Sequence, residues 1–285
     1  MFGTIIKGIG GFYYVKAQDN SIYECKARGV FRKEKIKPVI GDRVKIEIEK
    51  NGYAFITEIE NRTSLLIRPN VSNIDTLVIV LSTASPSPDF LLCDKLAVMA
   101  QSQNITPVIC ITKTDIKAGD EIIQAYKNTG YTIFSVCSKN GKGIDEIKAF
   151  LQDKTSAFAG LSGSGKSTLL NLLVAEELQT GDISKINRGK HTTRHVELFE
   201  LTDGGFVLDT PGFSSFEAEN VECENLDSLY PEMSKLNGLC RFKGCSHINE
   251  PDCAVKDALS RGKISQIRYN NYKNIYECLK NSKQW

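Results

Sequence analysis

The fold of this chain is decided by one stretch, Ala157-Phe158-Ala159-Gly160-Leu161-Ser162-Gly163-Ser164-Gly165-Lys166-Ser167-Thr168-Leu169-Leu170. A short apolar run precedes a glycine-rich turn, and a run that favours a helix follows it. Gly160 and Gly165 let the backbone turn tightly, so that its N–H groups and the N-terminus of the helix form a cradle for phosphate oxygens. The stretch therefore predicts a phosphate-binding loop.

The spacing within the loop also predicts the roles of single side chains. Lys166 would reach the β- and γ-phosphates of a nucleotide, and the hydroxyl of Ser167 would bind Mg²⁺. A Gly/Ser-rich linker is the alternative, but the apolar run and the helix supply the context that the pattern requires. The predicted nucleotide-binding residues of this loop are Gly160, Leu161, Ser162, Gly163, Ser164, Gly165, Lys166, Ser167 and Thr168.

Length and composition limit the possible classes of protein. The 285 residues suffice for two or three domains. No apolar stretch approaches the roughly 18 residues of a membrane span, and the N-terminus lacks the apolar core of a signal peptide. We therefore expect a cytoplasmic protein with no membrane partner. Nine cysteines, odd in number and scattered, favour reduced thiols with one metal cluster over a disulfide framework.

Charge is distributed unevenly along the chain. Residues 1–68 carry 13 Lys and Arg against 8 Asp and Glu, although the net charge of the whole chain is only +2. Two basic ends predict a polyanionic partner, and two solvated charged faces are an equally good explanation from charge alone. The basic residues concerned are Lys26, Arg28, Arg32, Lys33, Lys35 and Lys37 near the start, and Arg261, Lys263, Arg268, Lys273, Lys280 and Lys283 near the end.

Residues 3–62 alternate between apolar and polar, as short strands do. Strands are expected at 4–7, 12–15, 21–25, 43–48 and 54–59. Five antiparallel strands in this length favour a small closed barrel, with an OB-fold as the first choice. Four aromatic rings near the basic loop fit a surface that stacks bases, although for any one ring packing in the core is the better expectation. The rings are Phe12, Tyr13, Tyr14 and Tyr23.

After residue 68 the pattern changes to that of an α/β domain. Continuous apolar runs at 76–81 and 107–111 are typical of strands buried on both faces of a parallel sheet. Between them, Asp89 can cap a helix. The apolar face of this helix would be Leu92, Leu96, Met99 and Ala100. Further helices are expected at 120–128 and 144–152, with a strand at 131–136 between them.

Two segments at the ends of these strands predict guanine recognition. Thr112-Lys113-Thr114-Asp115 follows a buried strand directly, and GTPases have an Asn/Thr-Lys-x-Asp segment at this place. The Asp115 carboxylate can accept hydrogen bonds from two guanine N–H groups that adenine does not match. Alone, this segment could be an ordinary capped turn. Cys137-Ser138-Lys139, one strand later, resembles the loop that GTPases use against the same base edge, so the pair favours guanine.

Downstream of the phosphate loop, two segments resemble GTPase switches. Thr192 or Thr193, within Gly189-Lys190-His191-Thr192-Thr193, is placed like the threonine that closes on Mg²⁺, and a polar loop is the alternative. A hairpin of strands at 196–201 and 206–209 then leads to Asp209-Thr210-Pro211-Gly212. There Asp209 would hold Mg²⁺ through water and the Gly212 N–H would contact the γ-phosphate. The predicted Mg²⁺ ligands are Ser167, Thr193 and Asp209.

The motif order is that of a circularly permuted GTPase domain, because base recognition precedes the phosphate loop. A parallel sheet tolerates this order if the former termini were close together.

After the GTPase domain, three cysteines and one histidine lie within 14 residues. They can form a closed Cys₃His shell of the kind that holds structural zinc, and coincidental thiols are the alternative. The predicted ligands are Cys240, Cys245, His247 and Cys253. Helices at 254–260 and 264–281 would complete a third domain, with apolar Ile264, Ile267, Tyr272, Ile275 and Leu279 on the second helix.

We therefore predict an N-terminal all-β OB-fold barrel (1–68), a central circularly permuted α/β P-loop GTPase domain (69–217) and a C-terminal α-helical zinc-binding domain (218–285). Together these parts resemble the ribosome small-subunit-dependent GTPase A family (RsgA, also called YjeQ). The resemblance implies a bacterial factor that acts late in small ribosomal subunit maturation and binds ribosomal RNA. It also implies GTP hydrolysis to GDP and phosphate, stimulated by the subunit. We accordingly expect Mg²⁺ with GTP, one structural Zn²⁺ and a monomeric protein.

Phe213 follows Asp209-Thr210-Pro211-Gly212 directly, near the place where Ras-like enzymes have their catalytic glutamine. A phenyl ring cannot orient water as a glutamine side chain does. We expect slow intrinsic hydrolysis, with Lys166 and Thr193 as catalytic residues and water positioned by His191, by the switch threonines or by the ribosome. One alternative is a GTP-gated RNA-binding scaffold in which hydrolysis only resets binding. Another is a small-molecule kinase, against which the paired base-recognition segments argue.

Overall fold

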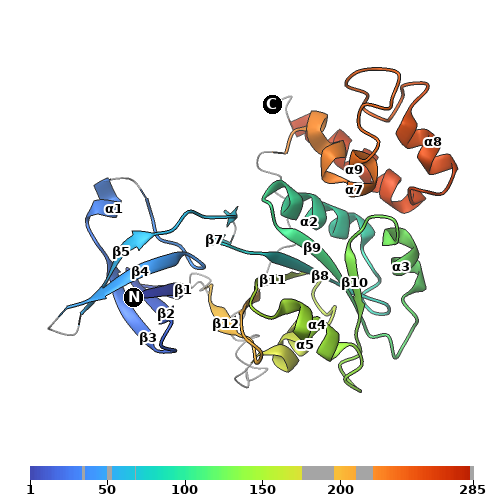
Figure 1. Cartoon of the computed structure of the whole chain (residues 1–285). Coiled ribbons are helices and arrows are strands. Elements are labelled where there is room, and N and C mark those ends of the chain that lie inside the picture. Colours follow the sequence, from blue (N-terminus) through green and yellow to red (C-terminus); the bar gives the residue numbers. More distant parts are fainter. Residues whose placement is uncertain (34–35, 50–52, 68, 175–195, 210–220, 283–285) are drawn as a thin grey trace. The chain divides into compact units, whose positions relative to one another are not determined.

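The computed structural model describes residues 1–33, 36–49, 53–67, 69–174, 196–209 and 221–282 (Figure 1). The chain divides into two compact units. The first comprises Met1–Thr76, Ile147–Phe158 and Ser167–Pro211, and the second comprises Leu77–Glu146, Ala159–Lys166 and Gly212–Trp285. Within the described ranges, every helix is too short or too polar to cross a membrane.

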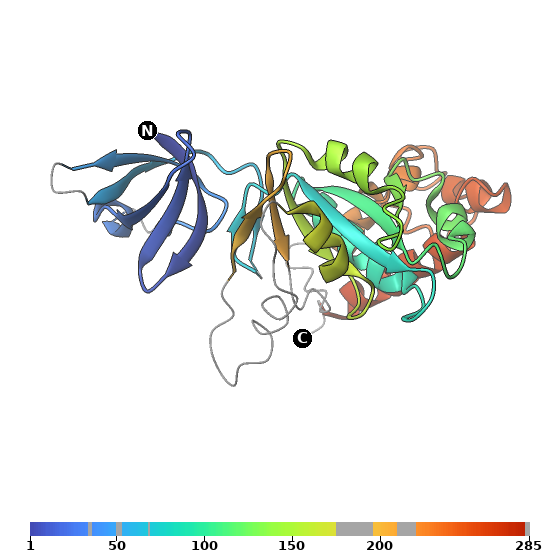
Figure 2. The ribbon, with the colours of Figure 1, turned by 90° about the horizontal axis from the view of Figure 1, so that it is seen from below.

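A closed barrel forms the N-terminal part of the first unit (Figure 2). Its strands are β1 (Phe2–Ile9), β2 (Phe12–Ala17), β3 (Ile22–Ala27), β4 (Arg43–Ile48) and β5 (Ala54–Ile59), and the short helix α1 (Val30–Lys33) follows β3. Alternate residues of the strands fill the interior, among them Ile5, Val15, Cys25, Val44 and Ile56. The predicted barrel is therefore confirmed, with strand bounds close to those expected from the alternation.

One strand pair departs from the prediction of five antiparallel strands. The order around the barrel is β1-β2-β3-β5-β4, and β3 runs parallel to β5 with Cys25 opposite Ala54. The reason is topological: strand directions cannot alternate all the way around a ring with an odd number of members. At least one pair in a closed five-stranded barrel must be parallel, and the alternation pattern carries no information about which pair it is.

The aromatic rings of the barrel divide between the core and the surface. Tyr13 and Tyr23 pack against the buried residues of the barrel. Phe12 lies under the Lys26 ammonium, 4.8 Å from its ring centroid, and the Tyr14 hydroxyl donates to Glu24 at 2.9 Å in an exposed position. Half of the rings thus contribute to packing, in agreement with the alternation.

A six-stranded sheet has the order β10-β9-β8-β11-β13-β12. Its strands are β8 (Thr76–Ser82), β9 (Thr106–Thr112), β10 (Thr132–Ser135), β11 (Thr155–Ala159), β12 (Leu198–Glu200) and β13 (Phe206–Asp209), and a separate pair consists of β6 (Leu65–Leu66) and β7 (Val71–Ser72). β10 pairs with β9 and β11 pairs with β13 in parallel, whereas β12 and β13 form an antiparallel hairpin. All residues of β8 are buried, as its continuous apolar run predicts.

In the described ranges, four helices accompany these strands, namely α2 (Phe90–Ser102), α3 (Asp120–Tyr126), α4 (Ile144–Leu151) and α5 (Lys166–Leu173). Asp89 caps α2 as predicted, because its carboxylate accepts from the N–H of Leu92 at 2.9 Å. The predicted apolar face of α2 is wrong at one position. Met99 is only partly buried, whereas the charged residue Asp94 is fully buried.

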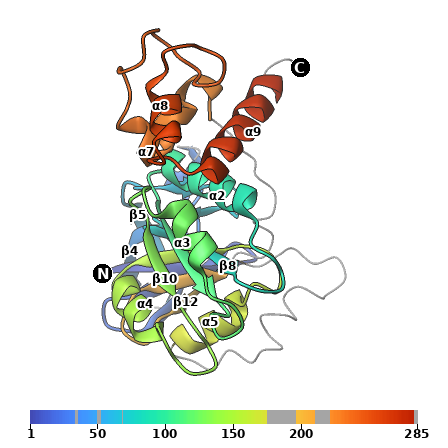
Figure 3. The same ribbon diagram turned by 90° about the vertical axis from the view of Figure 1, so that its right-hand side faces the viewer.

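The C-terminal segment packs against α2 within the second unit (Figure 3). It contains the 3₁₀ helix η1 (Cys223–Leu229), α7 (Pro231–Ser234), α8 (Ala254–Ser260) and α9 (Gln266–Ser282). Val98 of α2 shares a core with Tyr230, Val255, Ile264 and Ile275. Ile267 is only partly buried, and Arg268, which the charge pattern assigns to an exposed basic cluster, is 1% exposed. That assignment is therefore wrong for Arg268.

Candidate functional site

The glycine-rich loop connects the end of β11 to the start of α5, both as predicted. Gly160 has a φ of 143°, and a Cβ atom at this position would lie 2.4 Å from the main-chain oxygen of Val80. Only glycine can hold this backbone conformation so close to β8. Gly165 also has a positive φ of 97°. The two glycines that the motif requires are thus placed where a side chain would prevent the turn.

Lys166 extends back over the loop that precedes it. Its ammonium donates to the main-chain oxygens of Gly160 and Leu161, at 2.8 Å each. Ser162, Gly163, Ser167 and Thr168 are exposed around this loop. A cation, main-chain N–H groups and hydroxyl groups at a helix N-terminus are suited to bind phosphate.

The base-recognition segment at the end of β9 is hydrogen-bonded to the glycine-rich loop. The Thr112 hydroxyl, buried, donates to the Ser164 oxygen at 2.5 Å. The Lys113 ammonium donates to the Gly163 oxygen at 2.8 Å and to the Ser85 oxygen. Thr112, at a position where many GTPases have asparagine, therefore contacts the loop directly.

The two predicted base-recognition segments lie side by side, at the carboxyl ends of the adjacent strands β9 and β10. The Thr114 hydroxyl donates to the Val136 oxygen at 3.2 Å, and the Asp115 carboxylate pairs with the Lys139 ammonium at 2.7 Å. The hydrogen bond from Lys139 lowers the pKa of the Asp115 carboxyl below its ordinary value. Cys137 is buried, so in this loop the polar groups of Ser138 and Lys139 are the more accessible ones.

The predicted switch residues are mostly outside the described part of the chain. His191, Thr192, Thr193, Gly212 and Phe213 all lie in the ranges that are not described, as do Lys190 and Arg194. Asp209 is the last residue of β13, opposite Phe158 of β11. Its backbone is thus beside the strand that leads into the glycine-rich loop.

Four side chains in the C-terminal segment form a compact cluster of metal-ligating atoms. The ligand atoms of Cys240, Cys245, His247 and Cys253 all lie within 4.8 Å of one another. Nδ1 of His247 is 3.3 Å from the Cys253 sulfur and 3.6 Å from the Cys240 sulfur. Tetrahedral bonds of about 2.3 Å to one metal would separate sulfur ligands by about 3.8 Å. Three thiols and an imidazole at these separations fit one metal ion with a closed shell.

The ligands are oriented by neighbours that the motif did not predict. Nε2 of His247 faces an Asp227 carboxylate oxygen at 3.3 Å, which leaves Nδ1 for the metal. Burial raises the pKa of the Cys253 thiol, but N–H groups of Lys256 and Val255 at the start of α8 and the His247 ring outweigh it and lower the pKa overall. Asp227 is 20 residues from His247 in sequence, so no spacing rule indicates it.

Glu250 organises the turn between the ligands. Its carboxylate accepts from the Ser246 N–H at 2.8 Å and the Ser246 hydroxyl at 2.7 Å, and also from the N–H groups of Ile248 and Asn249. Burial raises the pKa of Glu250, but these donors outweigh it and lower the pKa to about 2. Its place between His247 and Cys253 is the one signal that could have indicated it from sequence.

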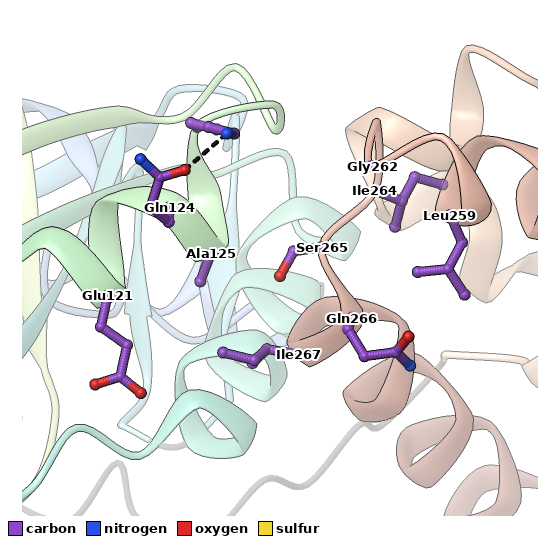
Figure 4. A pocket seen from close by; sticks show the side chains of 10 residues that line it. Glu121, Gln124, Ala125, Leu259, Gly262, Ile264, Ser265, Gln266 and Ile267 are labelled. Carbon is purple, nitrogen blue, oxygen red and sulfur yellow. Dashed lines mark hydrogen bonds between the residues drawn. The ribbon is translucent and has the colours of Figure 1, made fainter.

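A separate cavity of about 380 Å³ lies between α3 and the α8–α9 connection. Figure 4 shows Glu121 and Gln124 on one side of it and Leu259, Ser265 and Gln266 on the other. Among the described residues, none of the predicted nucleotide or metal ligands lines this cavity. It is therefore distinct from both candidate sites.

Comparisons with known proteins agree with this geometry. The family model of the RsgA GTPase matches residues 59–219, and that of the RsgA N-terminal domain matches residues 2–56. The chain is 46% identical, over the whole of both chains, to the small ribosomal subunit biogenesis GTPase RsgA of Agathobacter rectalis. It is 44% identical to the protein of that name from Bacillus subtilis, across 95% of this chain and 94% of the relative.

Two solved structures have the same fold. The crystal structure of YloQ, a circularly permuted GTPase, has a TM-score of 0.84 and 37% identity, covering 99% of this chain and 95% of that chain. YjeQ from Thermotoga maritima has a TM-score of 0.84 and 32% identity, with 98% of each chain covered. The predicted base-recognition segments precede the predicted phosphate loop, in the order expected of a circularly permuted GTPase, and the chain belongs to the RsgA GTPase family.

Proposed function

We propose that this protein hydrolyses GTP to GDP and phosphate in the late maturation of the small ribosomal subunit, which stimulates the reaction. The observation that carries the proposal is the direct connection of a base-recognition segment to a phosphate loop through Thr112 and Lys113. Relatives named small ribosomal subunit biogenesis GTPases, 42% to 46% identical to this chain, support the assignment to the subunit.

In this proposal the nucleotide spans two groups of residues. Asp115 accepts hydrogen bonds from the guanine ring N–H and amine, and the segments Thr112-Lys113-Thr114 and Cys137-Ser138-Lys139 shape the base pocket. The loop residues 160–168 bind the phosphates, and Gly212 contacts the γ-phosphate. Ser167, Thr193 and Asp209 would hold Mg²⁺, which would neutralise charge on the β- and γ-phosphates.

For catalysis we propose that Lys166 stabilises charge on the phosphates and that Thr193 contributes to the closed state of the switch. His191 is our candidate for positioning water. A His191→Ala variant should lose subunit-stimulated turnover while it still binds GTP. Full stimulated kcat in this variant would remove the histidine from the mechanism.

We further propose that the Cys₃His cluster holds one structural Zn²⁺. The cluster supplies four protein ligands, so a bound ion would have no open position for catalysis. Metal analysis of the purified protein should find one zinc per chain. The matched pair Cys240→Ser and Cys278→Ser tests the assignment, because Cys278 is an exposed thiol outside the cluster. Only the first substitution should remove the metal.

The proposed partners are the small subunit and its rRNA, with the protein acting as a cytoplasmic monomer. Two partly exposed rings of the barrel support contact with RNA, namely Phe12, which has the Lys26 ammonium over its ring, and Tyr14. Binding through Lys and Arg should weaken steeply as salt rises. Analytical ultracentrifugation tests the oligomeric state.

The deciding experiment measures hydrolysis of GTP and of ATP, with and without purified small subunits. We expect slow turnover of GTP alone, a large increase with subunits, and no comparable reaction of ATP. Equal use of ATP would contradict guanine recognition, and an absence of stimulation would contradict the link to the subunit. Release from subunits that is the same with GTP and with a non-hydrolysable analogue would favour a GTP-gated scaffold instead.

A further inference from the structure

Three charged side chains form a cluster, here called the buried ionic cluster, in the interior of the second unit. Arg268 of α9 is 1% exposed, Asp94 of α2 is 0% exposed and Glu232 of α7 is 7% exposed. The guanidinium donates twice to Glu232, at 2.8 and 3.1 Å, and once to Asp94 at 2.5 Å. Each of the three charges thus comes from a different helix, and the arginine bridges the other two.

The neighbours of the cluster satisfy its remaining polar atoms. Asp94 also accepts from the Tyr126 hydroxyl at 2.9 Å and from the Asn271 amide at 2.7 Å. The guanidinium lies 4.4 Å from the ring centroid of Tyr230 and 5.3 and 5.6 Å from those of Tyr126 and Tyr131. These contacts come from both sides of the boundary between α2–α3 and the C-terminal helices.

Stability alone is a poor explanation for such a cluster. Ion pairs that are removed from water cost desolvation energy, and well-packed apolar residues often stabilise a core at least as well. A buried charge that loses its partner is, however, strongly unfavourable. A shift of α2, α7 or α9 relative to the other two would leave one charge unpaired. The cluster therefore permits one arrangement of these helices and penalises intermediate ones.

Short paths lead from this cluster to both candidate sites. On one side, α2 starts at its cap Asp89, four residues after Ser85. The Lys113 ammonium donates to the main-chain oxygen of Ser85 and also to that of Gly163 in the phosphate loop. On the other side, Tyr269 and Tyr272 of α9 follow Arg268 by one and four positions. Their hydroxyls donate to the main-chain oxygens of His247 at 2.7 Å and Ser246 at 2.9 Å in the metal cluster.

We infer that the buried ionic cluster joins α2 of the nucleotide-binding part to the metal-binding helices as one mechanical body, so that nucleotide binding and metal binding are energetically coupled. Arg268 is the positioning residue of this joint. The inference rests on the proposed nucleotide and metal sites. By thermodynamic reciprocity, metal binding must raise the affinity for nucleotide by the same factor as nucleotide raises the affinity for metal.

The test is a binding cycle on the full-length chain, with GDP titrated into the zinc-loaded and the chelator-treated protein. We expect chelation to raise the Kd of GDP at least about fivefold in the parent. The ratio of the two Kd values should fall to about one in the variants Arg268→Lys and Asp94→Asn. The lysine keeps the positive charge but cannot make the bidentate contact. The control is Asp257→Asn, which breaks the exposed Asp257–Arg261 pair on α8, at 3.0 Å, and should retain the parent's factor.

A parent Kd that does not change on chelation, or variants that retain the full factor, would overturn the inference. If the variants do not fold, hydrogen exchange of the parent replaces them: adding zinc to the chelated chain should slow exchange in α2, at residues 90–102. This readout does not need GDP, so a failure of GDP to bind would count against the nucleotide site and not against the joint. Unchanged exchange in α2 would contradict the joint itself.

Discussion

The hydroxyl of Thr112 donates to the main-chain oxygen of Ser164 at 2.5 Å, across 52 positions in sequence. Through this bond the end of β9, which precedes Asp115, is attached to the glycine-rich loop at Ser164. Both groups are buried, so the bond is protected from competition by water. We conclude that Thr112, together with the Lys113 ammonium that donates to the Gly163 oxygen, sets the position of the glycine-rich loop relative to the end of β9.

Replacing Thr112 by Val should therefore weaken the binding of GDP and GTP alike. Loss of one buried hydrogen bond costs about 0.5–1.5 kcal/mol, or roughly a two- to twelvefold higher Kd. Thr112→Ser, which keeps the hydroxyl, should bind within about twofold of the parent. Titration with a fluorescent guanine nucleotide measures both. Equal affinities of the Val variant and the parent would show that the bond does not position the loop.

Asp115→Asn should change the base that the protein selects. In the proposed site the carboxylate would accept two hydrogen bonds from guanine, whereas the amide could accept only one. The variant therefore loses one charge-assisted hydrogen bond of about 1.5–3 kcal/mol, which corresponds to roughly a 10- to 150-fold higher Kd of GDP. The variant should instead gain affinity for xanthosine diphosphate, because its N–H₂ group matches the carbonyl of that base. Competition titrations with both nucleotides measure the change, and unaltered GDP affinity would exclude Asp115 from base recognition.

Asp227→Asn should weaken metal binding without removing a ligand. The carboxylate faces Nε2 of His247 at 3.3 Å, and loss of such an outer partner raises the metal Kd about 10- to 100-fold. Zinc competition against a chromophoric chelator gives the Kd directly. Asp257→Asn on α8 serves as the control, since Asp257 pairs only with the exposed Arg261 among the contacts described. Equal zinc affinity of both variants would contradict a role for Asp227.

Glu250 should make the stability of the protein depend on acid. Its pKa falls from an ordinary value of 4.5 to about 2 in the folded chain, so its contribution is fully present above pH 4.5 and is lost as the pH falls toward 2. The contribution is about 1 kcal/mol after allowance for screening by solvent. Chemical unfolding between pH 6 and pH 3 measures it. Glu250→Gln should show a smaller loss across this interval, and an identical pH profile would contradict the assignment.

The local elements of this protein could be predicted because they depend on local physics. Strands β4 and β5 have the bounds that alternation indicates, 43–48 and 54–59. The glycines of the phosphate loop adopt the positive φ angles that the motif requires. The Cys₃His cluster also follows from spacing, because all four ligands are within one short segment.

Other features could not be predicted because they depend on partners far away in sequence. On α2, Met99 is only partly buried although the pattern places it on the apolar face, and Asp94 is fully buried although it is charged. Asp94 can be buried because it pairs with Arg268, and this partner could not be predicted because it lies 174 positions later. In the sequence, a buried arginine of a basic segment cannot be distinguished from an exposed one, because its partners are not known. The parallel pairing of β3 with β5 likewise follows from closure of the barrel and not from either strand.

The amino-acid sequence alone determined the family and the motif order and predicted the ligand sets, because glycine conformation, strand periodicity and ligand spacing are properties of short segments. Only the tertiary structure decided that Thr112 and Lys113 hold the phosphate loop and that Arg268 is internal. The physical reason is that a hydrogen bond or a buried ion pair requires two groups at a fixed distance. For groups tens to hundreds of residues apart, the folded chain alone sets that distance.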